Sequence, residues 1–222
     1  MLQEIYLAPP FIKIQNSEIE NYYFTSDFHF NHKKILYYTN RSKFLSSYHD
    51  NISDSIKEMN ELIINNMNKV TENNPEAILI NCGDIILGDS SEIWNFLNKL
   101  KFKKIINIIG NHDFKYIKNC ICKFDENYRI QFSNLLYLQA GDKQFTISHI
   151  PLKYLPKDTY NIHGHLHSPD NLNDYQNNLD YQVAIECRED GLHLDCGVDR
   201  NKLSPVSLKD ILSGNTDINI GK

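Results

Sequence analysis

The chain has 222 residues, of which 41% are hydrophobic and 23% are charged, and this composition is ordinary for a globular protein. Single α/β domains commonly reach about 200 to 250 residues, so we expect one domain over residues 1–222. The formal net charge of -5 at pH 7 offers no basic surface of the kind that binds duplex nucleic acid without regard to sequence. The composition therefore disfavours that partner.

Cysteine usage and the N-terminal sequence both indicate a cytoplasmic protein. The five cysteines are odd in number and lack the spacing of a zinc ribbon, so we interpret them as reduced thiols. Cys120 and Cys122 form a pair suited to metal binding or redox chemistry, but no second cysteine pair supports either role. The first residues have no basic region before an apolar stretch, and no run approaches the ~18 apolar residues of a membrane span. We therefore expect no membrane partner.

In the first half of the chain, apolar runs rich in β-branched residues alternate with helical patterns. Residues 4–14 are apolar but contain Pro9 and Pro10, which suits an edge strand or an extended arm. Residues 51–70 carry apolar side chains at every third or fourth position, which predicts an amphipathic helix of about five turns. The other predicted elements are strands at 21–26, 77–81 and 103–109, and shorter helices at 31–38, 90–100 and 114–118.

Beyond residue 125 the pattern is typical of β-structure. Turn signals at Gly141-Asp142 and Asp190-Gly191 separate short apolar runs, and we expect these strands to form a second sheet. Residues 168–180 are rich in Asn, Asp, Tyr and Gln, which predicts a loop, and residues 207–212 predict a short closing helix. The predicted strands are 135–139, 144–148, 160–163, 182–186 and 192–196.

Asp, Asn and His side chains follow five of the predicted strands at the point where each strand ends. Because ligands bind outside the carboxyl ends of the strands in open α/β sheets, such residues point to chemistry at that edge. Asp27 and His29 are two residues apart, so an extended backbone directs both side chains to one side. Together the five segments predict a metal site: Thr25-Ser26-Asp27-Phe28-His29, Asn81-Cys82-Gly83-Asp84, Gly110-Asn111-His112-Asp113, Ile147-Ser148-His149 and Ile162-His163-Gly164-His165-Leu166-His167.

Taken in order, these segments resemble the calcineurin-like metallophosphoesterase family, whose pattern runs Asp-x-His, Gly-Asp, Gly-Asn-His-Asp/Glu, His and Gly-His-x-His. Two further features resemble its small phage and bacterial phosphodiesterase-type members, namely Phe30 and His32 after the first segment and the sequence from Pro205 to Leu208. The resemblance implies a mixed α/β fold, in which a two-sheet β-sandwich is flanked by helices in a four-layer αββα arrangement.

The resemblance also implies two overlapping sets of metal ligands that share Asp84. Imidazole ligands favour transition metals over magnesium or calcium, so we expect two divalent ions, with Mn favoured and Fe, Zn or Ni as alternatives. By resemblance, the first set is Asp27, His29, Asp84 and His167, and the second set is Asp84, Asn111, His149 and His165.

In this family a metal-activated water attacks phosphorus, and the resemblance assigns the remaining roles to side chains beside the ligands. His112 is the predicted general acid for the leaving group. Asp113 is predicted to accept a hydrogen bond from the other ring nitrogen of His112 and so to fix its orientation. His32 and Arg41 are predicted to face the substrate phosphate, although both also fit a simple solvated role. His163 precedes the glycine of its segment, so we expect it to contact ligand residues and not a metal.

The function predicted from these residues is hydrolysis of a small phosphodiester of the cyclic or linear nucleotide type. The segment that follows Asp84 lacks the arginine of the protein serine/threonine phosphatases, which argues against a phosphoprotein as the substrate. A nuclease or nucleic-acid end-processing enzyme is an alternative that the acidity and small size disfavour. A non-catalytic protein-binding scaffold is the alternative from another class, and the intact ligand pattern argues against it. The sequence leaves the physiological substrate and the oligomeric state open.

Overall fold

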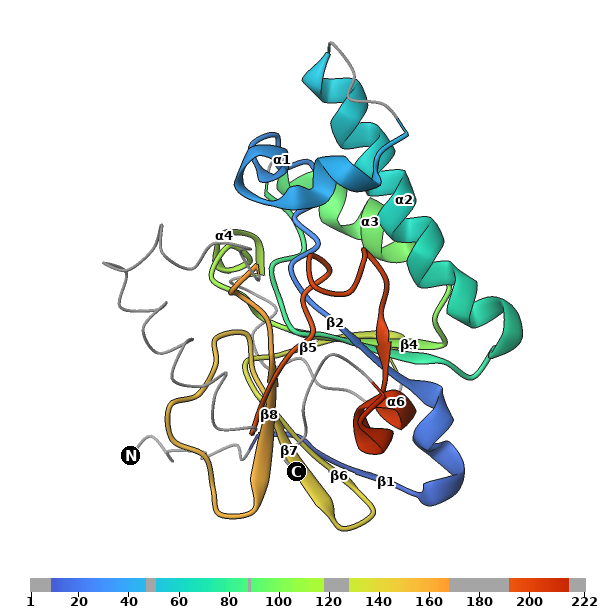
Figure 1. Ribbon diagram of the computed structural model, residues 1–222, viewed down its shortest axis with the longest axis vertical. Coiled ribbons are helices and arrows are strands. Elements are labelled where there is room, and N and C mark those ends of the chain that lie inside the picture. The colour runs from blue at the N-terminus through green and yellow to red at the C-terminus, as the bar shows by residue number, and fades with distance from the viewer. Residues whose placement is uncertain (1–8, 47–50, 88, 118–127, 168–191, 216–222) are drawn as a thin grey trace, which may run out of the picture.

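Two five-stranded sheets pack face to face, and helices flank them (Figure 1). The computed structural model describes residues 9–46, 51–87, 89–117, 128–167 and 192–215. The mixed α/β fold expected from the sequence, a two-sheet sandwich flanked by helices, is confirmed. Several predicted features lie outside the described residues: the loop at 168–180, the strand at 182–186 and the pair Cys120 and Cys122.

The first sheet has the strand order β10-β2-β3-β4-β5 and is parallel except for β10. Its strands are short and mostly buried, as expected for a parallel sheet covered on both faces. Thr25 pairs with Asn81 and Asn81 pairs with Asn107, so three neighbouring strands end at one level. The bounds are β2 Tyr22–Thr25, β3 Ile78–Asn81, β4 Lys104–Ile108, β5 Ile130–Ser133 and β10 Val206–Ser207.

Helix α2 (Ile52–Asn73) covers the outer face of this sheet together with α3 (Ile93–Lys99). The predicted amphipathic pattern is confirmed, because Met59, Ile63 and Met67 of α2 are fully buried against the sheet. The Asn51 side chain caps α2 by accepting from the backbone N–H of Ser53 at 3.0 Å. The remaining short helices are α1 Ile35–Tyr38 and α4 Phe114–Ile117, with 3₁₀ turns at Asn16–Asn21, Asn40–Phe44 and Ser90–Glu92.

The second sheet has the order β1-β6-β7-β8-β9, and a hydrophobic core fills the space between it and the first sheet. Ile80 and Ile106 of the first sheet and Phe145 and Ile162 of the second belong to this core. Strand β1 lies at the edge, as its two preceding prolines predict. The bounds are β1 Phe11–Ile14, β6 Leu136–Ala140, β7 Lys143–Ile147, β8 Thr159–His163 and β9 His193–Asp195.

Two short strands of the first sheet were not predicted. β5 extends the sheet by pairing with β4, and β10 pairs antiparallel with β2 directly before helix α6 (Leu208–Ser213). Helix α6 packs Leu208 and Ile211 into the core between the sheets, and Gly214 ends it in the left-handed region with φ 65°. Among the helices of the described ranges, none is both long and apolar enough to cross a membrane.

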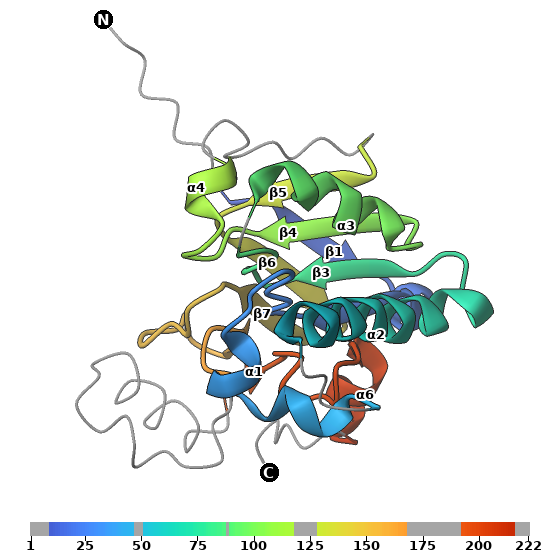
Figure 2. The same ribbon diagram turned by 90° about the horizontal axis from the view of Figure 1, so that it is seen from above.

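The fold brings the carboxyl ends of strands from both sheets to one side. Strands β2, β3 and β4 run parallel in the first sheet, and β7 and β8 run parallel in the second. In Figure 2, β3 and β4 point toward the side where α1 and α4 lie. The loops that leave these strands carry the predicted ligand residues, so the topology gathers them into one site.

Candidate metal centre

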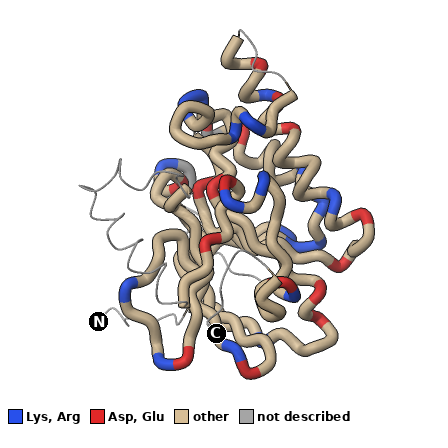
Figure 3. The backbone as a smooth tube through the Cα atoms, viewed as in Figure 1, with Lys and Arg blue, Asp and Glu red and all other residues tan. Residues whose placement is uncertain are grey.

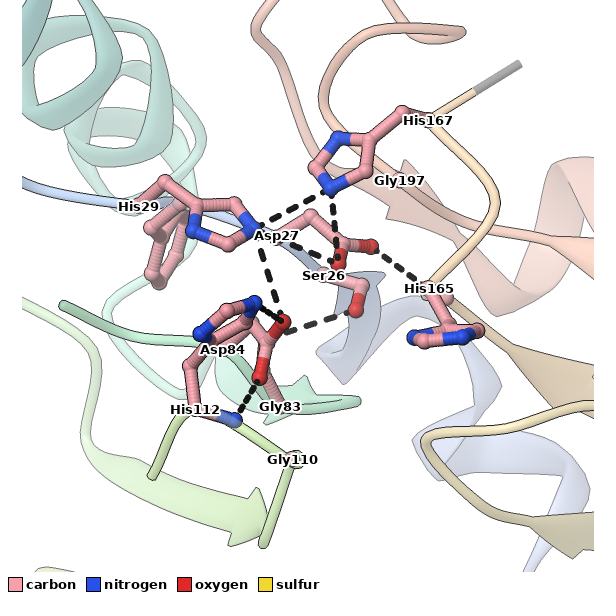
Figure 4. A network of polar contacts seen from close by, with 12 residues as sticks. Ser26, Asp27, His29, Gly83, Asp84, Gly110, His112, His165, His167 and Gly197 are labelled. Carbon is pink, nitrogen blue, oxygen red and sulfur yellow. Dashed lines mark hydrogen bonds and ion pairs between the residues drawn. The ribbon is translucent and has the colours of Figure 1, made fainter. Parts of the chain in front are cut away.

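Two groups of ligand atoms lie at the converging strand ends, and they share one residue. The first group is Asp27, His29 and His167, and the second is Asp27, Asp84 and His149. Within each group the ligand atoms lie within 4.8 Å of one another (Figure 4). Side chains from the ends of β2, β3, β7 and β8 are therefore close enough to bind common ions.

Contacts around His29 join the residues predicted for the first metal. Its Nε2 lies 3.1 Å from Nε2 of His167, 3.4 Å from Oδ2 of Asp84 and 3.9 Å from Oδ1 of Asp27. His167 Nε2 also lies 3.8 Å from Oδ1 of Asp27. These four residues, which come from three different strand ends, form a compact set of nitrogen and carboxylate donors.

The residues predicted for the second metal meet around Asn111 and His149. Oδ1 of Asn111 lies 2.8 Å from Nε2 of His149 and 3.1 Å from Nδ1 of His165. His149 Nε2 also lies 3.4 Å from Oδ2 of Asp84. The same Asp84 oxygen is thus 3.4 Å from both His29 and His149, which places this carboxylate between the two predicted sets.

The loops that carry these residues adopt an unusual backbone conformation. Asp27, His29 and Asp84 have φ values of 59°, 49° and 58°, in the left-handed region that residues other than glycine rarely occupy. His165 and His167 also have positive φ values, of 73° and 51°. Backbone hydrogen bonds between the loops hold this arrangement, with Asp27 donating to Gly83 at 2.9 Å and His29 to Asp84 at 3.0 Å. Such strain is concentrated at functional sites, where surrounding structure fixes it.

Two glycines let the loops approach one another. A Cβ on Gly83 would lie 2.6 Å from Nδ1 of His149 and 2.8 Å from Cα of Gly110, and Gly83 has φ +105°. A Cβ on Gly110 would lie 2.2 Å from Oδ1 of Asp84 and 2.5 Å from its backbone nitrogen. The glycines of the Gly-Asp and Gly-Asn-His-Asp segments are therefore required for the close contact between Asp84 and the loop after β4.

Burial and the neighbouring carboxylates shift the pKa values of the residues in the centre. Burial raises the pKa of Asp27. Burial also disfavours a charge on His149, but Asp84 outweighs it and raises the pKa of this histidine to about 9. The pKa of His29 is well below its usual value because the ring is buried and close to His167. The Asp84 carboxylate thus stabilises positive charge on His149, while burial disfavours a charge on both Asp27 and His29.

The donor set fits divalent cations on two observations. Oδ1 of Asp27 is buried and accepts no hydrogen bond, although Oδ2 accepts from the His165 backbone at 2.9 Å. Nδ1 of His149 donates to the Cys82 carbonyl at 2.7 Å and Nδ1 of His167 to Asp199 at 2.8 Å. Metal-binding histidines characteristically donate one ring nitrogen to such an acceptor, which leaves the other free as a ligand.

His112 and His32 lie at the rim of the centre. The His112 side chain is 39% exposed, and its Nε2 lies 3.9 Å from Oδ2 of Asp84. The half-buried His32 ring lies 5.3 Å from that of His29 and packs edge-on against Tyr38. Burial, followed by the proximity of His112, lowers the pKa of His32 to about 4, so this ring is neutral at pH 7. Both side chains lie beside the predicted ligands.

The structure corrects the prediction that Arg41 faces the substrate. Its side chain is 0% exposed, and the guanidinium donates to the Asp199 carboxylate and to the carbonyls of Asp27 and Phe28. These hydrogen bonds commit the guanidinium to partners within the protein, so it is not free to bind a phosphate. A buried arginine needs this degree of pairing to offset the loss of hydration.

The predicted contact between Asp113 and His112 is also corrected. Asp113 is fully buried, and its Oδ2 accepts from the backbone N–H groups of Asp84 at 2.8 Å and Gly110 at 2.9 Å. Its Oδ1 accepts from the N–H of Ile85 at 2.9 Å. Asp113 therefore ties the loop after β4 to the loop after β3, and does not orient the His112 ring.

Asp199 was missed by reasoning from the sequence. Its carboxylate binds both Arg41 and His167, and it follows the end of β9, which is parallel to β8. Asp199 could have been predicted if the polar residues that follow β9 had been considered together with those that follow the other five strands. His163 was predicted to contact ligand residues, and its Nδ1 lies 2.9 Å from the carbonyl oxygen of the adjacent Gly164. His163 itself belongs to neither group of ligand atoms.

A two-sheet α/β fold that gathers Asp, Asn and His at its strand ends defines a candidate metal-dependent hydrolase. The family model for calcineurin-like phosphoesterases matches residues 21–206, and the chain belongs to this family.

Two further similarities accompany this match. The chain is 29% identical to the uncharacterized protein MJ1445 of Methanocaldococcus jannaschii over 194 residues, which cover 84% of this chain and 86% of that protein. It also resembles the crystal structure of Pseudomonas putida nuclease MPE, with 14% identity and a TM-score of 0.39, over 67% of this chain and 62% of that one. The likeness to the nuclease thus spans less than two thirds of its length.

Proposed function

We propose that this calcineurin-like phosphoesterase hydrolyses small phosphodiesters of the cyclic or linear nucleotide type, using two divalent transition-metal ions, preferably Mn. The observation that carries the proposal is the position of Asp84, whose Oδ2 lies 3.4 Å from both His29 Nε2 and His149 Nε2. One carboxylate shared between two sets of nitrogen ligands is what a two-metal hydrolase requires. The family membership supports a metal-dependent phosphoester hydrolase independently.

Seven residues would hold the ions in two sets that share Asp84. Asp27, His29 and His167 would complete one set, and Asn111, His149 and His165 would complete the other. When bound, such ions supply Lewis-acid stabilisation of the phosphate oxygens and lower the pKa of water. The carboxylates of Asp27 and Asp84 offset the charge at the centre, and the imidazoles favour transition metals.

His112 would then supply the proton that the leaving oxygen needs. Its side chain is 39% exposed and its Nε2 lies 3.9 Å from Asp84 Oδ2, so the ring lies beside the centre and within reach of solvent. Histidine is the side chain that most often transfers a proton to or from a reacting group in enzymes. His32, which is neutral and at the same rim, would bind a phosphate oxygen through a ring N–H.

A small substrate is supported by the charge of the protein. The net charge is -5, and in Figure 3 Lys and Arg are spread around the fold and interspersed with Asp and Glu. The buried Arg41 is committed to internal partners, so it adds no charge for a long polyanion. A non-catalytic scaffold would have no need to keep every predicted ligand together with His112 at one edge.

Hydrolysis of bis(p-nitrophenyl) phosphate by chelator-treated protein tests the proposal. We expect turnover to need added Mn, to disappear again with chelator, and to be accompanied by two bound ions per chain. Cyclic nucleotides, dinucleotides and phosphomonoesters should then be compared, with diesters expected to be the better substrates. Asp84→Asn should lose both ions and the activity. Metal-independent turnover, or an Asp84→Asn variant that retains both ions, would contradict the proposal.

A further inference from the structure

The buried Arg41 joins two parts of the centre that are far apart in the sequence. Its Nε and one terminal nitrogen donate to the two oxygens of Asp199 at 2.7 and 2.8 Å, which is the bidentate geometry of a strong ion pair. The same terminal nitrogen donates to the Asp27 carbonyl at 2.6 Å, and the other donates to the Phe28 carbonyl at 2.8 Å. The Arg41 guanidinium thus connects the loop after β9 to the loop after β2 through hydrogen bonds.

The loop after β2 needs such a partner because its backbone is strained. Asp27 and His29 have positive φ values, and the two carbonyls that Arg41 binds lie between their α-carbons. Left-handed residues of this kind are energetically unfavourable and persist only where the surroundings fix them. Arg41 is therefore placed to hold the side chains of Asp27 and His29 in their observed directions.

Asp199 connects Arg41 to the predicted ligand His167. Its Oδ2, which accepts from Arg41, also accepts from Nδ1 of His167 at 2.8 Å. Burial disfavours the Asp199 carboxylate, but Arg41 outweighs it and holds the pKa of Asp199 far below its usual value, so the acceptor is charged. With its Nδ1 engaged in this way, His167 presents Nε2 toward Asp27 and His29.

The other set of predicted ligands has different support. His149 is oriented by the Cys82 carbonyl at 2.7 Å, and Asn111 contacts His149 and His165. The hydrogen bonds of the Arg41 guanidinium go instead to Asp199, to the carbonyls of Asp27 and Phe28 and to Sδ of Met59, and Asp199 also accepts from His167. The support of the centre is therefore divided between its two halves.

We propose that Arg41 and Asp199 are positioning residues for one metal subsite, the one formed by Asp27, His29 and His167. The pair sets the affinity of that subsite through His167 and the loop after β2. The subsite formed by Asn111, His149 and His165 meets the pair only indirectly, through Asp27, whose Oδ2 accepts from the His165 backbone N–H at 2.9 Å, so it should depend on the pair much less. The inference rests on the proposed two-metal function, because it assigns the pair to one of the two subsites.

Titration of metal-free protein with Mn²⁺, followed by calorimetry and by electron paramagnetic resonance, tests this division. We expect two ions on the wild-type chain. In Asp199→Asn the amide can accept from His167 or from Arg41, but its NH₂ group then faces an N–H donor, so the ring loses its fixed direction. We expect one ion to bind roughly 10- to 100-fold more weakly, which is typical of the loss of such a partner, and the affinity for the other ion to change much less.

Arg41→Lys should weaken the same ion, because a lysine keeps the charge but cannot form the bidentate contact. Glu76→Gln is the control, since it removes an exposed carboxylate that pairs with Lys103 away from the centre. Circular dichroism and thermal unfolding of the metal-free variants report the fold separately, and Asp199→Asn carries the test by itself if Arg41→Lys does not fold.

Equal weakening of both ions, or two unchanged affinities in Asp199→Asn, would overturn the division of the centre. A wild-type chain that binds no Mn²⁺ would instead overturn the proposed two-metal function on which the division rests. The two failures are thus distinguished by the wild-type titration alone. A variant that is merely less stable would show a lower unfolding temperature with both relative affinities unchanged.

Discussion

Asp84 contacts His112 through both carboxylate oxygens. Oδ1 accepts from the His112 backbone N–H at 3.0 Å, and Oδ2 lies 3.9 Å from Nε2 of the same residue. The oxygen that approaches the His112 ring is also the one that lies 3.4 Å from His29 and from His149. The predicted proton donor is therefore tied to the carboxylate that the two predicted ligand sets share, and its ring remains partly open to solvent.

His112→Asn should keep both ions and lose turnover. The substitution removes the ring but leaves the backbone N–H that donates to Asp84. If general acid catalysis is the main contribution of the ring, the loss on a nucleotide diester with an alkoxide leaving group should be roughly 10²- to 10⁴-fold. A nitrophenolate leaves without protonation, so the loss on bis(p-nitrophenyl) phosphate should be far smaller. Steady-state rates on the two substrates, together with metal analysis, measure both effects.

Equal losses on the two substrates would show that His112 stabilises charge on the phosphate and does not donate a proton. Loss of an ion would show that it is a ligand. His193→Asn is a suitable control, because its Nε2 lies 2.8 Å from the Leu152 carbonyl and it belongs to neither group of ligand atoms. This control should leave the leaving-group dependence unchanged.

Asp113→Asn should lower the stability of the metal-free protein. The carboxylate accepts from three backbone N–H groups, whereas an amide in its place directs an NH₂ group at one or more of these donors. Each buried donor left without an acceptor costs about 1 to 3 kcal/mol. Urea denaturation of the metal-free variant measures the loss. Asp142→Asn, in an exposed turn, should change the free energy of unfolding little, and an equal effect of both substitutions would refute the role of Asp113.

Much of the centre could be predicted because strand ends in a parallel sheet carry positional information. Asp27, Asp84 and Asn111 each follow a strand of the first sheet, and His149 and His165 follow strands of the second. Each lies within three residues of its strand, so there is little chain in which the side chain could move away. The order of the segments then sufficed to predict ligand residues, and the structure brings these residues together.

The corrected residues depend on partners that no local pattern reveals. Arg41 and Asp199 are separated by 158 positions, and the 0% exposure of Arg41 results from packing beneath the loop after β2. In the sequence, a basic residue near a predicted site resembles a phosphate ligand whether it is buried or exposed. Asp113 follows His112 directly, but the turn after β4 directs its carboxylate toward backbone groups of the neighbouring loop. The short strands β5 and β10 could not be predicted for a similar reason, because they form by pairing with β4 and β2.

Gly110→Ala should disrupt the centre without introducing a charged or large group. The added Cβ would lie 2.2 Å from Oδ1 of Asp84 and 2.5 Å from its backbone nitrogen, so the Asp84 loop would have to move. We expect weaker binding of both ions and loss of turnover, because Asp84 belongs to both predicted ligand sets. Gly141→Ala is the control for a substitution away from the centre: its Cβ would meet no atom closer than 3.9 Å, and its φ of +61° confines the backbone strain to that turn, so metal binding should not change. Normal metal stoichiometry in Gly110→Ala would contradict the assignment of Asp84 as the shared ligand.

Long duplex DNA should be a poor substrate at moderate salt, while small diesters are hydrolysed. Binding of duplex DNA depends on the release of counterions by lysine and arginine, and each phosphate contact contributes a slope of about -0.9 to the dependence of log K on log salt. A chain with a net charge of -5 and a buried Arg41 can gain little binding free energy from counterion release.

Cleavage of plasmid DNA and hydrolysis of a dinucleotide should therefore be compared over a series of salt concentrations with Mn present. We expect the dinucleotide rate to be high and nearly independent of salt. Efficient DNA cleavage that falls steeply as salt rises would favour a nuclease over the proposed small-diester hydrolase, while leaving the metal centre and the role of His112 unchanged.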